Sequence, residues 1–134
     1  MKYLIIKLVK VKKKVLVVEN DYDIRDIVAF ILEEEGFECL SMPEPETMDA
    51  ILDFKPAIIM IDEFINNKPG HRLCLKIKQV DSLKHIPVIV LSTANDIELI
   101  TKECKADDYV RKPFDVDEMI EKIMRAIDKQ PLIF

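Results

Sequence analysis

Polar side chains with complementary chemistry follow the apolar runs of this sequence. Asp62 comes directly after four consecutive apolar residues, and three other runs are followed by acids with an amide, by two hydroxyls and by a lysine: Glu19, Asn20 and Asp21; Ser92 and Thr93; Lys112. Carboxylate and amide oxygens suit a hard divalent cation, and Mg²⁺ is commonly held by only one or two carboxylates and by waters. A lysine and a hydroxyl can hold phosphoryl oxygens. A carboxylate between the metal and the lysine could attack phosphorus and form an aspartyl phosphate.

The runs that precede these side chains are typical of buried strands. The run that ends at Asp62 is bounded by Pro56 on one side and by the turn-forming residues 66–70 on the other. This pattern favours a strand buried on both faces of a parallel sheet. Short runs rich in apolar residues predict four more strands, over residues 15–18, 38–42, 86–91 and 109–110.

Helical periodicity follows each predicted strand. The segment before Gly36 places five apolar side chains on one face, Ile24, Ile27, Val28, Ile31 and Leu32, and Gly36 is typical of the residue that ends a helix. Further helices are predicted to begin at Pro45, to cover residues 73–80, and to begin at Asn95 and Asp115 with Glu98 and Glu118 completing their caps. The inner face of the last helix is predicted at Val116, Met119, Ile120, Ile123 and Ile127.

Five alternations of strand and helix predict a single α/β domain. The fold class is a doubly wound, five-stranded parallel sheet of flavodoxin-like order 2-1-3-4-5, with helices on both faces. In that order the carboxyl ends of the strands meet at one edge of the sheet, so Asp62 and the other polar residues would lie side by side. We expect the domain at residues 14–129, between a basic and apolar N-terminal extension at 1–13 and a C-terminal tail at 130–134.

The composition of the 134 residues argues against several classes of function. The net charge is −5 although residues 1–14 hold six lysines and no acid, so the body of the chain is acidic and poorly suited to nucleic acid. No apolar run approaches the roughly 18 residues of a membrane span, so no membrane insertion is expected. With two glycines the chain has neither a dinucleotide fingerprint nor a P-loop. The three widely spaced cysteines favour free thiols in a reducing cytoplasm.

The chain resembles the receiver domains of two-component response regulators, of the stand-alone CheY-like kind. The resemblance covers roughly residues 14–128 and is carried by four motifs: Val15-Leu16-Val17-Val18-Glu19-Asn20-Asp21, Ile58-Ile59-Met60-Ile61-Asp62, Ile86-Pro87-Val88-Ile89-Val90-Leu91-Ser92 and Ala106-Asp107-Asp108-Tyr109-Val110-Arg111-Lys112-Pro113-Phe114. The last of these motifs is the most specific.

The resemblance implies a phosphoacceptor and a metal site. Asp62 falls at the phosphoacceptor position. The Mg²⁺ ligands that the resemblance implies are Glu19, Asn20, Asp62 and the backbone carbonyl of Phe64, two residues beyond the acceptor. Lys112 falls at the position of the lysine that binds the phosphoryl group, and its bond to Pro113 is expected to be cis.

The resemblance also implies a switch and its partners. Ser92 matches the switch hydroxyl that turns toward the phosphoryl group, and Tyr109 matches the switch aromatic. A sensor histidine kinase or phosphotransfer protein would phosphorylate Asp62, as in a phosphorelay. A downstream protein would bind the face formed by the fourth helix, the fifth strand and the fifth helix. The implied protein is a cytoplasmic single-domain response regulator with its own phosphorylation and dephosphorylation chemistry, not a turnover enzyme.

The sequence departs from the family pattern at several positions. Asn20 stands where an aspartate is usual, which removes one negative charge and should weaken Mg²⁺ binding. The loop after Asp62 lacks the usual Met-Pro, and Lys105 stands where glycine is usual. Phe64 is bulky at a position that influences attack of water on the phosphoryl group, so slow autodephosphorylation is expected.

Other functions fit the sequence less well. The alternative that Asn20 keeps open is a degenerate receiver, a protein-binding module that works without phosphorylation. A phosphatase of the haloacid-dehalogenase type would need a second aspartate two residues after the nucleophile, where Phe64 stands. A flavodoxin-like flavin binder would need a loop of Ser, Thr and Gly after the first strand, and Glu19-Asn20-Asp21 is found there.

Overall fold

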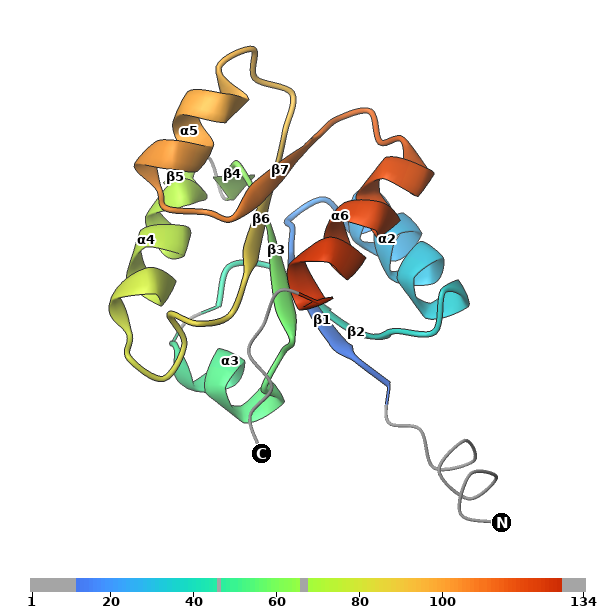
Figure 1. Cartoon of the computed structure of the whole chain (residues 1–134), viewed down its shortest axis with the longest axis horizontal. Helices are drawn as coiled ribbons and strands as arrows, with labels where there is room; N and C mark the ends of the chain where they lie inside the picture. Colours follow the sequence, from blue (N-terminus) through green and yellow to red (C-terminus); the bar gives the residue numbers. More distant parts are fainter. Residues whose placement is uncertain (1–11, 46, 66–67, 129–134) are drawn as a thin grey trace.

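The computed structural model describes residues 12–45, 47–65 and 68–128 (Figure 1). The N-terminal extension expected at 1–13 lies outside the described residues except for its last two, and the tail expected at 130–134 lies wholly outside them. The described residues form a central sheet with helices on both of its faces, as the alternation of strand and helix patterns predicted.

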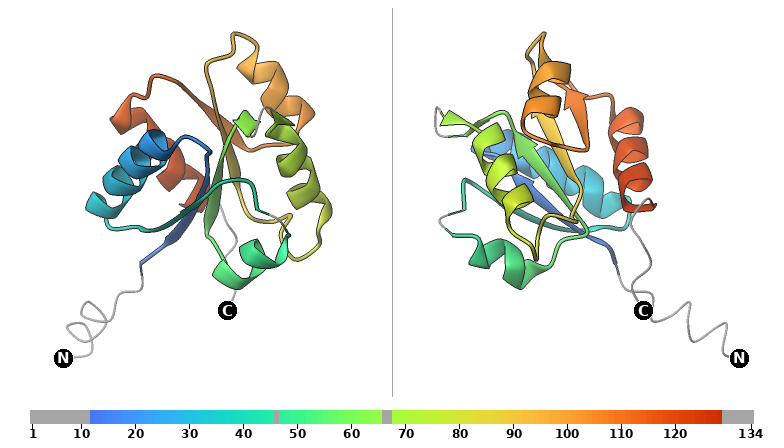
Figure 2. Two further views of the ribbon diagram at one scale, coloured as in Figure 1. Left: turned by 180° about the vertical axis from the view of Figure 1, so that it is seen from behind. Right: turned by 60° about the vertical axis from the view of Figure 1, so that its left-hand side comes forward.

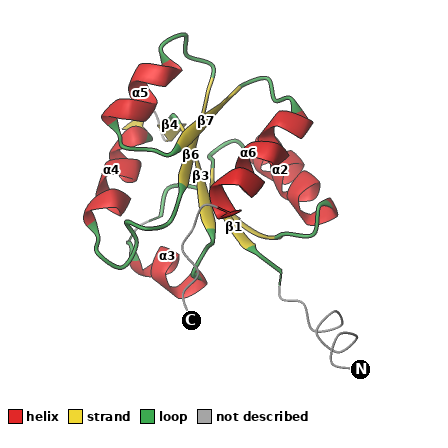
Figure 3. Ribbon diagram, viewed as in Figure 1, coloured by secondary structure: helices red, strands yellow, loops and turns green. Residues whose placement is uncertain are grey.

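Five parallel strands form the central sheet (Figure 3). They are β1 (Lys14–Val18), β2 (Glu38–Met42), β3 (Ile58–Asp62), β6 (Val88–Ser92) and β7 (Asp108–Arg111). Their order is β2-β1-β3-β6-β7, which confirms the predicted order 2-1-3-4-5 because β6 and β7 are the fourth and fifth strands of this sheet along the chain. A short antiparallel pair, β4 (Phe64–Ile65) and β5 (Lys68–Pro69), follows β3 and was not predicted.

The helices divide between the two faces of the sheet. Helices α2 (Tyr22–Glu34) and α6 (Val116–Asp128) lie together on one face, and α3 (Asp49–Phe54), α4 (His71–Gln79) and α5 (Ile97–Glu103) cover the other (Figure 2). Each face has its own hydrophobic core: Val28, Leu32, Met119 and Ile123 belong to the first, and Ile51, Leu73, Ile77 and Cys104 to the second.

Strand β3 supplies both cores, which explains its uninterrupted apolar run. Successive side chains of a strand point to opposite faces of the sheet. Ile59 and Ile61 therefore lie in the core beneath α3 and α4, whereas Ile58 and Met60 lie in the core beneath α2 and α6. All four are fully buried. A strand buried on both faces ends in Asp62, whose side chain must then find polar partners.

The predicted helix faces are correct at their centres and wrong at their edges. Val28 and Leu32 of α2 are buried, but Ile27 is 56% exposed, and Arg25 is buried instead with its guanidinium 4.3 Å from the centre of the Tyr22 ring. In α6, Val116 was predicted on the inner face and is 41% exposed. Helical periodicity gives the direction of an apolar stripe, but neighbouring elements decide its width.

Two of the predicted helix starts are also wrong. Helix α3 begins at Asp49 and not at Pro45, and the carbonyl of Met48 accepts its first hydrogen bonds. Met48 precedes the helix and makes no capping hydrogen bond with its side chain, so no capping residue marks this start in the sequence. Helix α5 begins at Ile97 after Asp96, so Asn95 is not its cap. The cap of α6 is confirmed, because Asp115 Oδ1 accepts the Glu118 N–H at 3.1 Å.

Candidate functional site

The sheet brings the predicted site residues to one edge. Asp62 is the last residue of β3 and Ser92 the last of β6, while Glu19 follows β1 and Lys112 follows β7. In the register of the sheet, Asp62 is paired with Leu91, and Ser92 is paired with Arg111. The Lys112 N–H continues this pairing by donating to the Ser92 carbonyl at 2.9 Å. The convergence of the four strand ends was predicted, and the structure confirms it.

Lys112 joins the two carboxylates of the site. Its Nζ donates to Asp62 Oδ1 at 2.6 Å and to Glu19 Oε2 at 3.1 Å. Glu19 and Asp62 are buried, and the Lys112 side chain is largely buried. Buried carboxylates need partners of opposite charge, because their desolvation is otherwise too costly. The peptide bond from Lys112 to Pro113 is cis, as the resemblance implied.

The pKa values at this site reflect burial and crowding. Burial raises the pKa of Glu19, and the negative charge of Asp62 raises it further, while the Asp21 N–H and Lys112 act in the opposite sense. Burial lowers the pKa of the Lys112 ammonium, but its hydrogen bond to Asp62 and the charges of Asp62 and Glu19 outweigh burial and leave that pKa raised. One ammonium therefore faces two carboxylates that repel each other.

These residues fit a divalent cation. The repulsion between Asp62 and Glu19 is what a bound cation relieves. Asn20, next to Glu19 in the chain, has a buried side-chain oxygen, and an amide oxygen is a neutral ligand that suits such a cation. The Phe64 backbone lies two residues beyond Asp62, in β4. Among the residues that the structure describes, no three His, Cys, Asp or Glu side chains gather as a metal-binding group. The donor set is thus two carboxylates and an amide, which is typical of Mg²⁺ with several waters.

Ser92 has a partner that the sequence analysis missed. Its hydroxyl donates to Glu63 Oε2 and accepts the Ala94 N–H at 2.9 Å. Both members of the Ser92–Glu63 pair are buried, at 1% and 8% exposure. The signal for this contact was the acid directly after Asp62, but its use depends on the register of β3 and β6, which the sequence does not give.

The backbone after Asp62 is closely packed. The Glu63 N–H donates to the Leu91 carbonyl at 2.9 Å, and the Glu63 carbonyl accepts the N–H of Gly70. A Cβ on Gly70 would overlap the backbone carbonyl oxygen of Asp62. Glycine is therefore required at position 70 by close approach, and this contact fixes the loop against the end of β3.

Tyr109 contacts both α5 and α6. Its hydroxyl donates to Glu98 Oε1 of α5 at 2.9 Å, and its ring lies beneath Lys122 Nζ at 4.4 Å from the ring centre. The hydrogen bond to Glu98 raises the pKa of the Tyr109 phenol. The two predicted switch residues, Ser92 and Tyr109, have separate partners here, and their joint role stays a prediction.

The family model of the response regulator receiver domain matches residues 15–124, most of the chain. The chain belongs to this family. Receiver domains are the phosphorylated modules of two-component systems; they generally bind Mg²⁺ at an acidic pocket and interact with histidine kinases or phosphotransfer proteins.

Relatives of known sequence or structure agree with the family. The phosphate regulon transcriptional regulatory protein PhoB of Pseudomonas aeruginosa is 31% identical over 120 residues, which cover 87% of this chain and 52% of PhoB. The chain thus spans about half the length of that relative. NtrX from Brucella abortus is 30% identical with a TM-score of 0.79, and the match covers 90% of this chain and 28% of NtrX.

A solved structure at lower identity shows the same fold. Chemotaxis protein CheY4 of Vibrio cholerae has a TM-score of 0.78 at 20% identity, and the match covers 87% of this chain and 99% of CheY4. Among the described residues, no helix has the length and apolar character needed to cross a bilayer.

Proposed function

We propose that this receiver domain is a phosphorylated response regulator in which Asp62 accepts the phosphoryl group from a histidine kinase or phosphotransfer protein. The observation that carries the proposal is the position of Lys112 Nζ, 2.6 Å from Asp62 Oδ1 and 3.1 Å from Glu19 Oε2. A buried nucleophile, a buried acid and a shared ammonium at the edge of a parallel sheet are the parts that phosphoryl transfer requires.

Each side chain has a defined task in this transfer. Lys112 engages Oδ1 of Asp62, so Oδ2 is the oxygen proposed to attack phosphorus. A bond forms between this oxygen and phosphorus while the bond from phosphorus to the donor's histidine nitrogen breaks, and that nitrogen keeps the electron pair. The Lys112 ammonium then pairs with the phosphoryl oxygens and neutralises part of their charge.

Glu19, Asn20, Asp62 and the backbone carbonyl of Phe64 are proposed to hold Mg²⁺. The cation would supply positive charge opposite the transferred group, as in other phosphoryl transfer sites. The buried carboxylate pair supports this assignment because ionised Glu19 and Asp62 repel each other in its absence.

The proposed output surface is formed by α5, β7 and α6. Tyr109 of β7 connects these elements, because its hydroxyl bonds Glu98 of α5 and its carbonyl accepts from Lys122 of α6 at 2.5 Å. Phosphorylation at Asp62 would shift a two-state equilibrium, and Ser92 and Tyr109 would change partners with it. The signal would then pass to a downstream protein that binds this surface.

Incubation with acetyl phosphate, with and without Mg²⁺, tests the proposal. Intact mass should show one phosphoryl adduct that requires Mg²⁺ and is absent from Asp62→Asn. After removal of the donor, the adduct should decay more slowly than in ordinary receivers under matched conditions, as expected from the bulk of Phe64. A folded wild-type protein that gives no adduct at high Mg²⁺ would overturn the proposal.

A degenerate receiver is the second candidate. The observation that favours it is Asn20, which leaves the site one carboxylate poorer than the family pattern. This candidate predicts that Asp62→Asn, which cannot be phosphorylated, binds the downstream protein as tightly as the wild type. Loss of binding in that variant would exclude it.

A further inference from the structure

Glu63 accepts the hydrogen bond that Ser92 would need to donate elsewhere for switching. The Ser92 hydroxyl has one hydrogen to donate, and in this structure Glu63 Oε2 accepts it. The Ala94 N–H occupies an acceptor position of the same oxygen at 2.9 Å. The Ser92 hydroxyl can donate to a phosphoryl oxygen on Asp62 only after its hydrogen bond to Glu63 has broken.

Glu63 is fixed in a position to keep this contact. Its N–H donates to the Leu91 carbonyl at 2.9 Å and its carbonyl accepts from Gly70, so the backbone is held on both sides. The carboxylate is buried and is not one of the two that Lys112 binds. A hydrogen bond to an ionised acceptor is stronger than one to a neutral acceptor, so breaking the hydrogen bond from Ser92 to Glu63 costs an appreciable free energy.

We propose that Glu63 is a positioning residue that holds the Ser92 hydroxyl away from Asp62 until a phosphoryl group displaces it. This inference rests on the proposed function and adds Glu63 to it as a competitor for the Ser92 hydroxyl. Two anions, the Glu63 carboxylate and the phosphoryl group, compete for one hydroxyl, and Glu63 lowers the stability of the phosphorylated form.

The first experiment measures the contact without phosphorylation. Urea unfolding midpoints are compared for wild type, Glu63→Met, Ser92→Ala and the double variant. Ser92→Ala should lower the midpoint strongly in the wild type, because buried Glu63 then lacks its donor, and only weakly when position 63 is Met. Additive effects of the two substitutions would mean that Glu63 and Ser92 do not interact, and would overturn the inference.

The second experiment measures the competition. Glu63→Gln keeps an acceptor of the same shape but removes its charge, and it should raise the fraction of protein phosphorylated by acetyl phosphate, with a lifetime of the adduct about three- to tenfold longer. In a Ser92→Ala background the same substitution should leave the phosphorylated fraction and the lifetime of the adduct unchanged. A structural role of Glu63 alone would not produce this dependence on Ser92.

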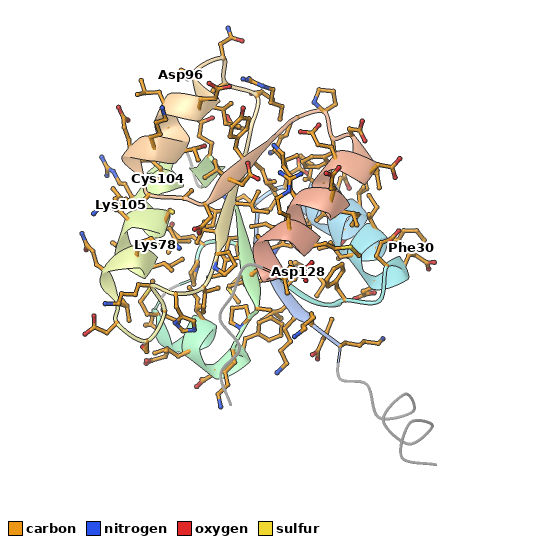
Figure 4. The ribbon with its side chains drawn as sticks, in the orientation of Figure 1. Phe30, Lys78, Asp96, Cys104, Lys105 and Asp128 are labelled. Atoms are coloured by element: carbon orange, nitrogen blue, oxygen red, sulfur yellow. The ribbon has the colours of Figure 1, made fainter. Side chains whose placement is uncertain are left out.

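A matched control separates the hydroxyl from simple charge. Asp96 is exposed at the start of α5, in the loop that follows Ser92 (Figure 4). Asp96→Asn removes one negative charge from the same region and should leave the lifetime of the adduct unchanged. If Glu63→Gln acts equally with and without Ser92, charge repulsion explains the effect and the inference is wrong.

The outcomes distinguish this inference from the proposed function. If the wild type is phosphorylated and Glu63→Gln behaves like it, the inference fails and the proposed function stands. If no variant gives an adduct, both fail, and coupling in the unfolding cycle would show only that Glu63 and Ser92 interact.

Discussion

Asn20 is the residue that sets the charge of the proposed metal site. It follows Glu19 at the end of β1, and its side-chain oxygen is buried. The carboxylates of Glu19 and Asp62 already repel each other. An aspartate there would give a third carboxylate, which strengthens attraction for a divalent cation and increases repulsion in its absence. The amide therefore weakens the binding of the metal but makes the metal-free protein more stable.

Replacement of Asn20 by aspartate should strengthen Mg²⁺ binding and destabilise the metal-free protein. We expect the Mg²⁺ concentration that gives half-maximal adduct formation to fall by about tenfold. Tenfold corresponds to about 1.4 kcal/mol, which is the order of magnitude of one added charge at short range. The metal-free variant should unfold at a lower temperature than the wild type. Titration of adduct formation with Mg²⁺ and thermal unfolding without it measure the two effects.

Asn95→Asp is the control for this prediction. Asn95 is exposed in the loop after β6, so the same chemical change there adds a charge outside the proposed ligand set. It should leave the Mg²⁺ dependence nearly unchanged. An equal gain in both variants would mean that general charge, and not a ligand at position 20, governs the affinity.

At the scale of the elements, two glycines are required for different reasons. Gly36 follows α2 with a φ of 93°, a conformation that favours glycine, but a Cβ there would meet no atom within 4 Å. Gly70 precedes α4 with an ordinary φ of −66°, but a Cβ there would overlap the end of β3 at Asp62. Gly36 is therefore required for the backbone conformation of a turn, and Gly70 for the close approach of the loop to Asp62.

Alanine at these two positions should therefore have different consequences. Gly70→Ala should destabilise the protein by about 2 kcal/mol or more and reduce adduct formation, because the loop or the end of β3 must move. Gly36→Ala should cost about 1 kcal/mol through its backbone strain and leave adduct formation intact. Urea unfolding and intact mass after acetyl phosphate treatment measure both, and normal phosphorylation in Gly70→Ala would contradict the argument.

The elements also show which features a sequence can predict. Five strands were predicted because apolar runs that end in polar residues are a local signal, and the strand order then brought Asp62, Lys112, Glu19 and Ser92 together. The partner of Ser92 was missed because the contact with Glu63 depends on the register between β3 and β6. The exposed Ile27 was missed because neighbouring elements decide the width of an apolar stripe, and the late start of α3 was missed because no capping side chain marks it.

At the scale of the whole molecule, the site affects global stability through Glu19. Burial and the charge of Asp62 raise the pKa of Glu19 above its ordinary value of 4.5. The folded protein thus holds this proton more tightly than the unfolded chain does. The stability that Glu19 contributes is fully present below about pH 4.5 and is lost as pH rises through the raised pKa, at about 1.4 kcal/mol for each unit of the shift.

Glu19→Gln should remove this loss, since glutamine does not ionise. Without divalent cations, the free energy of unfolding of the variant relative to the wild type should rise between pH 4 and pH 7, and urea unfolding across that range measures it. Glu34→Gln, at an exposed position of α2, controls for the loss of one surface charge. Mg²⁺ should then restore stability at pH 7 in the wild type far more than in Glu19→Gln, because binding to the folded form adds RT ln(1 + [Mg²⁺]/Kd). Parallel pH curves, or an equal response of both proteins to Mg²⁺, would show that Glu19 neither bears this charge nor binds the cation.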